Sequence, residues 1–152
     1  MFTRALIAFL ALPGTIAFFI PAVWLWGTAH TRLAVPLGLI PLMSGFIGLL
    51  WCVRDFYVAG KGTLAPWAPP KNLVVVGLYR CSRNPMYIAV MLILLGWAIV
   101  FASRALFVYL LCVAAAFQLR VVYGEEPWLA RTHGEAWRQY AGRIPRWLGW
   151  LR

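Results

Sequence analysis

Four long apolar stretches restrict what this chain can fold into. They cover about residues 5–26, 34–53, 86–103 and 105–123. Each has roughly 18 to 22 residues, and a helix of that length, rising about 1.5 Å per residue, crosses a hydrocarbon core about 30 Å thick. The pattern predicts an all-α integral membrane protein with about four transmembrane helices.

The composition agrees with a membrane protein and limits the number of domains. Of the 152 residues, 63% are hydrophobic and 12% are charged, whereas soluble domains have about 45–50% and about 25%. One domain, residues 1–152, is all that this length allows beside the apolar stretches. Any ligand site must therefore be built from helix ends and loops.

The basic residues predict how the chain is oriented. Pairing the apolar stretches into hairpins leaves two short turns, and of the 14 Lys and Arg only Arg32 and Arg104 fall in them. By the positive-inside rule, the opposite side is cytoplasmic. We therefore expect both termini, the loop of residues 54–85 and the active site to face the cytoplasm.

The net charge of +10 indicates a membrane surface as the partner of this chain. Basic residues interleaved with Trp beside apolar stretches are typical of a bilayer interface, where anionic headgroups attract Lys and Arg. We expect no nucleic acid as a partner. The three cysteines, Cys52, Cys81 and Cys112, lack the spacing of a zinc site or a disulfide framework, and we expect no metal.

The start of the third apolar stretch carries the first candidate site residues. Pro85 suits a first helical turn, Asn84 suits an N-cap, and free N–H groups at a helix start attract anions. Arg83 beside this positive end makes an anion-binding corner. A capped helix with a basic membrane anchor explains the same residues equally well.

Two adjacent acids, Glu125 and Glu126, follow the fourth apolar stretch and precede Pro127. Because Pro127 has no N–H to donate, the helix is expected to break or kink there. Like charges near the negative end of a helix dipole are unfavourable, so something cationic should compensate them. The pair is either solvated at the surface or part of a site for a positively charged or polyhydroxylated ligand. The tail that follows predicts an amphipathic helix bent at Gly134.

Four motifs in fixed order resemble one family of membrane enzymes. They are PP-x-x-LV-x-x-G-x-YR, RNPMY, the EE pair and G-E-x-W-x-x-Y-x-x-R-I-P, which together span about residues 60–147. The set is similar to the membrane methyltransferases that include isoprenylcysteine carboxyl methyltransferase and the phospholipid N-methyltransferases. In this sequence Asn84 stands where eukaryotic carboxyl methyltransferases have His, and His133 replaces a more usual aromatic residue.

The resemblance implies an enzyme that binds S-adenosylmethionine at the cytoplasmic ends of its last two membrane helices. The amphipathic C-terminal helix would cover this pocket, and a lipid or prenylated small substrate would enter from the bilayer. The resemblance assigns cofactor binding to Tyr79, Arg83, Asn84, Pro85, Tyr87, Glu125 and Glu126. It places Arg143, Arg83 and Tyr140 near the reacting groups.

The atom that accepts the methyl group stays open at this point. With a carboxylate acceptor, Arg143 would orient the nucleophile and no base is needed; with an amine or thiol, a Glu or Tyr140 would take the proton. Carboxyl O-methylation and phospholipid N-methylation are both consistent with the motifs. The alternatives are an NADPH-dependent reductase of the steroid reductase type and a non-catalytic membrane scaffold. The sequence does not set the oligomeric state.

Overall fold

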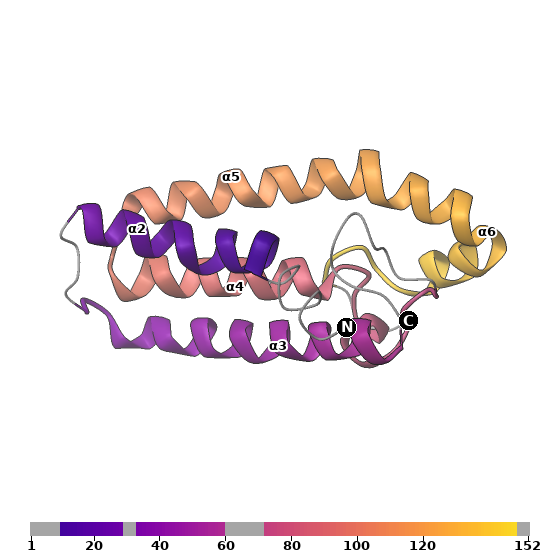
Figure 1. The fold of residues 1–152 in the computed structure, drawn as a ribbon, viewed down its shortest axis with the longest axis horizontal. Helices are drawn as coiled ribbons and strands as arrows, with labels where there is room; N and C mark the ends of the chain where they lie inside the picture. Colours follow the sequence, from indigo (N-terminus) through magenta and orange to yellow (C-terminus); the bar gives the residue numbers. More distant parts are fainter. Residues whose placement is uncertain (1–9, 29–32, 60–71, 149–152) are drawn as a thin grey trace.

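The computed structural model describes residues 10–28, 33–59 and 72–148, and within these ranges all regular structure is helical. This confirms the helical part of the predicted fold class. The molecule is elongated, and its long helices run along the longest axis (Figure 1).

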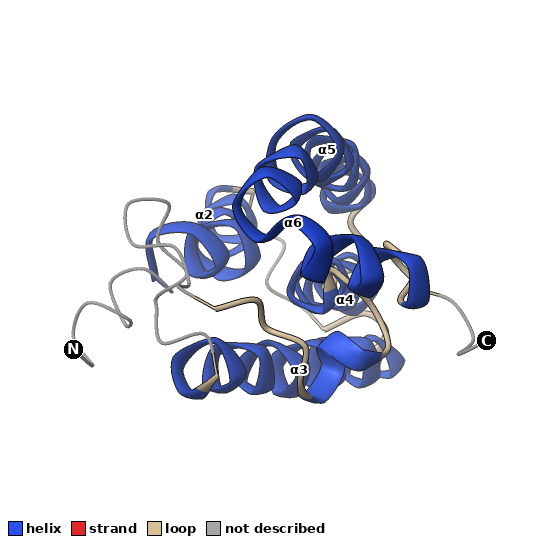
Figure 2. Cartoon of the chain, turned by 90° about the vertical axis from the view of Figure 1, so that its right-hand side faces the viewer, coloured by secondary structure: helices blue, strands red, loops and turns tan. Residues whose placement is uncertain are grey.

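Three long helices form the body of the bundle. They are α3 (Leu39–Val58), α4 (Pro85–Val100) and α5 (Arg104–Arg120). A π-helical turn, η4 (Val121–Glu125), joins α5 to α6 (Glu126–Arg143), which lies across one end of the bundle (Figure 2). This arrangement leaves one end of the molecule formed by turns and the other covered by α6.

The first apolar stretch is helical wherever it is described. It consists of η1 (Leu10–Phe19), a π-helical segment that contains Pro13, and α2 (Ile20–Gly27). Trp97 and Tyr109 hold it against α4 and α5, because their side chains donate to the carbonyls of Ala17 and Ile16 at 3.0 and 3.3 Å. The beginning of the stretch predicted at residues 5–26 lies outside the described residues.

Two described helices are long and apolar enough to cross a membrane, Pro36–Val58 and Arg104–Arg143. The second helix extends beyond the predicted span of residues 105–123, because α5, η4 and α6 follow one another without interruption. The apolar helices Pro13–Gly27 and Pro85–Val100 are shorter; the 16 residues of α4 rise about 24 Å. Two of the four predicted spans therefore have full length in the described residues, and the other two stay predictions.

The residues that follow the first predicted turn meet the end of α4 at the end of the bundle opposite α6. The backbone N–H groups of Ala34 and Val35 both donate to the carbonyl of Val100, at 2.8 and 3.1 Å. Helix α4 ends there because Ala102 has a positive φ of 47° and Ser103 caps the next helix through its hydroxyl. These bonds hold residues 34–35 against the end of α4.

Helices α3 and α4 form the closest contact of the bundle, and two glycines permit it. A Cβ on Gly45 would lie 2.6 Å from the carbonyl oxygen of Ala89, and one on Gly96 would lie 2.6 Å from the backbone nitrogen of Leu42. Leu49 and Ile93, both fully buried, fill the core beside these contacts. Small residues that let backbones approach closely are typical of helix pairs in membranes.

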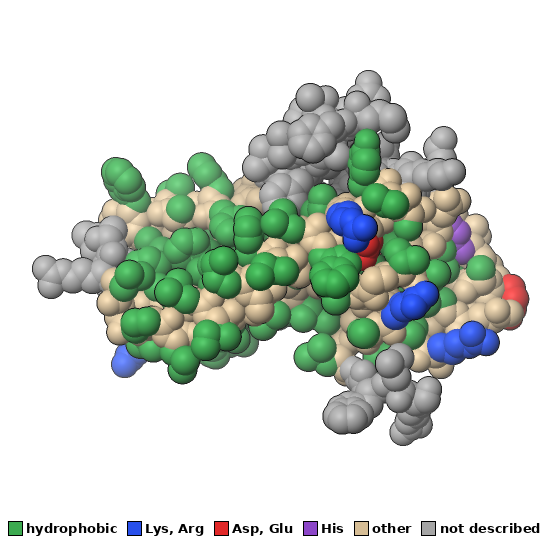
Figure 3. All heavy atoms as spheres, turned by 90° about the horizontal axis from the view of Figure 1, so that it is seen from below, with side chains coloured by type: hydrophobic (Ala, Val, Ile, Leu, Met, Phe, Trp, Pro, Cys, Tyr) green, Lys and Arg blue, Asp and Glu red, His purple; other side chains and the backbone are tan. Residues whose placement is uncertain are grey.

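The outer surface of the bundle is largely apolar, and charged side chains gather toward the end that carries α6 (Figure 3). A soluble monomer rarely exposes a continuous apolar surface of this kind. Large hydrophobic side chains that are at least half exposed on the bundle include Phe19, Val23, Trp26, Leu33, Leu37, Ile40, Ile47, Val108 and Leu111.

We expect the substitution Gly96→Ala to destabilise the fold. Its Cβ meets backbone atoms of Leu42, which cannot rotate away, so α3 and α4 must move apart. Overpacking of this kind costs about 1–3 kcal/mol. Thermal unfolding in detergent measures the loss as a lower Tm.

Gly142→Ala is the matched control, because a Cβ there has no neighbour within 4 Å. This variant should keep the wild-type Tm or raise it slightly, since Ala favours a helix over Gly by about 0.5–1 kcal/mol. Equal Tm values for the two variants would contradict the close contact between α3 and α4.

Candidate functional site

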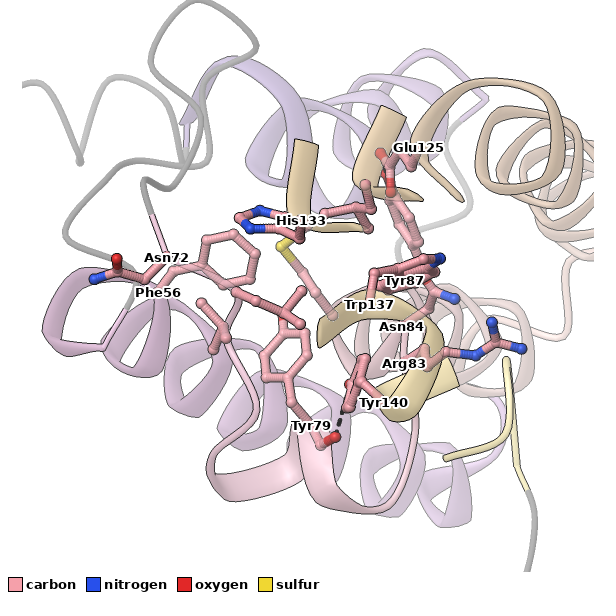
Figure 4. A pocket seen from close by; sticks show the side chains of 14 residues that line it. Phe56, Asn72, Tyr79, Arg83, Asn84, Tyr87, Glu125, His133, Trp137 and Tyr140 are labelled. Atoms are coloured by element: carbon pink, nitrogen blue, oxygen red, sulfur yellow. Dashed lines mark hydrogen bonds between the residues drawn. The ribbon is translucent and has the colours of Figure 1, made fainter. Parts of the chain in front are cut away.

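A cavity of about 90 Å³ lies at the end of the bundle that α6 covers. Its walls come from the end of α3, residues 72–84, the start of α4, η4 and α6, so segments far apart in the sequence meet there (Figure 4). The lining residues are Phe56, Asn72, Leu73, Val74, Tyr79, Arg83, Asn84, Met86, Tyr87, Glu125, Leu129, His133, Trp137 and Tyr140.

A tight turn before α4 brings Tyr79 into this cavity. The turn is η3 (Gly77–Arg80), and Gly77 has a positive φ of 57°. A Cβ at Gly77 would fall on the carboxylate of Asp55, so only glycine fits both the φ and the space. Tyr79 is buried against Cys52 and Val74. Residues 60–71 of the predicted loop 54–85 lie outside the described residues.

Glu125 is bound by two side chains at the polar side of the cavity. The hydroxyl of Tyr87 donates to Glu125 Oε1, and Arg120 Nε donates to the same oxygen at 2.9 Å. Arg120 Nε also lies 3.1 Å from the hydroxyl oxygen of Tyr87. This cluster joins α4, α5 and η4 where the cofactor was expected.

Glu126 makes a separate ion pair with two arginines. Arg83 Nη1 lies 3.0 Å from Glu126 Oε1. Arg146 donates hydrogen bonds to both carboxylate oxygens of Glu126, at 2.9 and 2.8 Å. The side chains of Arg83 and Glu126 are only 14% and 16% exposed, so the solvated-surface alternative is wrong for Glu126. The expected cationic compensation of both acids is thus confirmed.

Residues 144–147 lie against the start of α4. Backbone carbonyls of this segment accept hydrogen bonds from the residues just before the helix. The N–H of Arg83 donates to the carbonyl of Pro145 at 2.9 Å. The side chains of Asn84 and Ser82 donate to the carbonyl of Arg146 at 3.0 and 3.2 Å. Asn84 stands at the N-cap position, as predicted, but its side chain binds this segment instead of capping the helix.

The helix does not break at the acidic pair. It widens into the π-helical turn η4, and Pro127 then occupies the first turn of α6, where a missing N–H is tolerated. The bend predicted at Gly134 is confirmed, because the φ of 52° at this residue interrupts the helix. The bend turns Trp137 and Tyr140 back over the cavity (Figure 4).

The structure brings most of the predicted site residues together but not all of them. Those that line the cavity are Tyr79, Arg83, Asn84, Tyr87, Glu125 and Tyr140. Pro85 is buried at the first position of α4, and Glu126 pairs with Arg83 beside the cavity. Arg143 is exposed at the end of α6 and does not line the cavity, so its predicted role near the reacting groups has no support from this arrangement.

Several residues of the site were not identified from the sequence. Arg120 and Arg146 satisfy the two acids, and Phe56 and Trp137 supply aromatic walls. Because two adjacent acids require nearby cations, the sequence predicted that basic side chains would bind them. It did not show which arginines these would be. Trp137 also lies 5.7 Å from the guanidinium of Arg83, within cation–π distance.

Tyr140 acts as a hydrogen-bond donor in this site. Its hydroxyl donates to the backbone carbonyl of Tyr79 at 2.8 Å. Burial raises the pKa of Tyr140 above its ordinary value, and burial also raises the pKa of Tyr79. Both phenols are therefore neutral at physiological pH, and Tyr140 is poorly suited to accept a proton.

We expect Glu126→Gln to loosen residues 144–147. The substitution leaves two arginines of a mostly buried ion pair without a compensating charge, which costs about 1–3 kcal/mol. Hydrogen exchange should rise at the amide of Arg83, which donates to Pro145. The control Glu135→Gln removes an acid that is 68% exposed and should change exchange at Arg83 little. Unchanged exchange in Glu126→Gln would show that the ion pair does not hold this segment.

Comparison with known proteins assigns the chain to a family. The model of the phospholipid methyltransferase family matches residues 33–136. The cobalt-zinc-cadmium resistance protein CzcN of Cupriavidus metallidurans is 29% identical over 119 residues, which cover 78% of this chain and 50% of that protein. The chain thus spans about half the length of this curated relative, and no solved structure matches it. Because the family model covers more than half of the sequence, the chain belongs to the phospholipid methyltransferase family.

Proposed function

We propose that this protein is a membrane-embedded methyltransferase that uses S-adenosylmethionine to methylate a lipophilic acceptor. The observation that carries the proposal is the cavity at the end of the apolar bundle. Residues that the sequence motifs assign to cofactor binding line it from three directions: Tyr79, Asn84 with Tyr87, and Glu125. Membership of the family supports the reaction class.

The chemistry of the lining residues fits the cofactor. S-adenosylmethionine carries a sulfonium and an ammonium group, a carboxylate and a ribose diol, and when bound it supplies an activated methyl group. Glu125 suits the ammonium group or the ribose hydroxyls, and the amide of Asn84 suits polar atoms of either kind. The aromatic faces of Trp137 and Tyr79 suit a sulfonium cation.

The size of the cavity sets a condition on binding. Its volume of about 90 Å³ is smaller than the roughly 300–1,000 Å³ of ordinary small-molecule pockets. A cofactor must therefore extend beyond this cavity or displace the side chains that close it. The bent end of α6, with Trp137 and Tyr140, is the wall best placed to move, because Gly134 interrupts the helix before it.

The apolar side of the cavity supports a lipophilic acceptor. Phe56, Leu73, Val74 and Leu129 line it opposite the polar cluster around Glu125. Together with the apolar outer surface, they suit a lipid or prenylated substrate that reaches the site from a bilayer (Figure 3). The distribution of basic residues supports a cytoplasmic position for this end of the bundle.

The similarity to CzcN does not lead us to a metal-binding role for this chain. That relative is named for resistance to cobalt, zinc and cadmium. Among the described residues, no group of three or more His, Cys, Asp or Glu side chains is placed to hold a metal ion.

Binding of S-adenosylhomocysteine to the detergent-purified protein tests the proposal. Calorimetry should show saturable binding of this product, whereas NADPH should not bind. Glu125→Gln should weaken the affinity by about 10- to 100-fold, since a charge-assisted hydrogen bond contributes about 1.5–3 kcal/mol.

Glu135→Gln is the control for this variant, because Glu135 is an exposed acid on α6 outside the cavity. It should bind S-adenosylhomocysteine like the wild type. Binding of NADPH alone would favour a reductase of the steroid reductase type, and binding of neither ligand to a folded sample would favour a non-catalytic scaffold.

A further inference from the structure

The second half of α6, residues 135–143, covers the cavity, and we call this segment the lid. Trp137 and Tyr140 line the cavity from the lid (Figure 4), whereas Leu129 lines it from the half of α6 before the bend. The covered space of about 90 Å³ is less than a third of the roughly 300 Å³ at which ordinary small-molecule pockets begin. A ligand of ordinary size therefore enters only if part of this wall moves.

Trp137 and Tyr140 bind the lid to the opposite wall of the cavity. The hydroxyl of Tyr140 donates to the backbone carbonyl of Tyr79 at 2.8 Å, and the ring of Trp137 lies 5.7 Å from the guanidinium of Arg83. Among the 18 residues of α6, all of which the structure describes, Trp137 is the one buried side chain. A segment with so little buried surface opens at a lower free energy than the core of a fold.

The backbone of Gly134 gives the lid its closed position. Its φ of 52° and ψ of −120° depart from the helix and bend α6 back over the cavity. These angles are those of the first central residue of a type II′ turn, where glycine dominates because other residues are strained there. A Cβ at Gly134 would have no neighbour within 4 Å, so the chain needs glycine here for its backbone angles and not for space.

The other end of the lid is fixed to the start of α4. Ile144 leaves the helix in an extended conformation, and the N–H of Arg83 donates to the carbonyl of Pro145 at 2.9 Å. Arg146 then donates to both carboxylate oxygens of Glu126. The lid is thus attached at both ends, with non-helical backbone at each. Rotation about these two joints moves the lid and leaves the ion pair of Glu126 in place.

We propose that residues 135–143 rotate about Gly134 and Ile144 between this closed position and an open one, and that the rotation controls the entry of ligands into the cavity. The identity of the ligand, S-adenosylmethionine, rests on the proposed function, whereas the motion of the lid does not. Because the closed lid excludes the ligand, the contacts of Trp137 and Tyr140 with the opposite wall oppose binding. The apparent affinity and the association rate then depend on the fraction of molecules whose lid is open.

Nitroxide labels on both sides of the closed contact measure the position of the lid. Cys81 is exposed and follows Tyr79 by two residues, and Gln139 is exposed on the lid, so Gln139→Cys supplies the second label site. Cys112→Ser removes the other exposed thiol among the described residues, and Cys52 is fully buried. The distance between the two labels, measured by electron paramagnetic resonance, increases when the lid opens.

Two variants should raise the open fraction in the absence of a ligand, for different reasons. Gly134→Ala places a side chain at backbone angles that strain it, so the ratio of open to closed molecules should rise about tenfold or more. Tyr140→Phe removes the hydrogen bond to Tyr79, so this ratio should rise about three- to tenfold.

Gly142→Ala is the matched control for Gly134→Ala. It adds the same methyl group to the lid in open space, at a residue whose φ is not positive, and should keep the wild-type distances. Wild-type distances in both Gly134→Ala and Tyr140→Phe would overturn the proposal. If Gly134→Ala does not fold, the distances in Tyr140→Phe decide it.

Binding kinetics separate a lid from a wall that only contacts the ligand. Tyr140→Phe should raise the association rate constant of S-adenosylhomocysteine about three- to tenfold, because more molecules are open. Loss of a direct contact alone would act on the dissociation rate. An unchanged association rate constant in Tyr140→Phe would overturn the control of entry by the lid. Failure of S-adenosylhomocysteine to bind the wild type would instead remove the proposed function, and the label distances would still decide whether the lid moves.

Discussion

The neutralisation of two adjacent carboxylates organises the site end of this molecule. Glu125 and Glu126 follow an apolar helix and are largely withdrawn from water, so each needs a cation of its own. Arg120 meets Glu125 from the same helix, whereas Arg83 and Arg146 reach Glu126 from two other segments. In meeting this electrostatic demand, the chain fixes the start of α4 against α6 and the residues that follow it. The cavity lies beside these pairs, and Glu125, Arg83 and aromatic side chains form part of its wall.

The opposite end of the bundle depends on packing instead of charge. Gly45 and Gly96 let α3 and α4 come close enough for backbone contact, and Val100 accepts hydrogen bonds from the turn that precedes α3. Van der Waals contact along the apolar helices therefore stabilises the helical bundle, and ion pairs at the helix ends stabilise the site. This division places the polar, water-accessible chemistry where the apolar helices stop.

Much of the site was predictable from local sequence, because its residues occupy fixed positions at helix ends. The spacing of Arg83, Asn84 and Tyr87 places them around the start of α4, with Asn84 at the N-cap and Tyr87 on the first turn. A proline after two acids indicates a distortion of the helix. The sequence did not predict that Arg146, and not Arg143, would take part in the site. This outcome depends on the extended conformation of Ile144, which ends α6 and redirects the chain so that Arg146 meets Glu126. The location of His133 at the cavity likewise depends on the fold of α6 over α4, which no local pattern reports.

The π-helical turn η4 also determines which way each acid faces. Successive residues of a helix point about 100° apart, and a π turn holds one residue more than an α turn. In this register Glu125 faces Tyr87 at the cavity, and Glu126 faces the arginines beside it. The wide turn thus lets two adjacent acids serve different neighbours, Glu125 the tyrosine and arginine at the cavity and Glu126 the two arginines that join the start of α4 to the residues after α6.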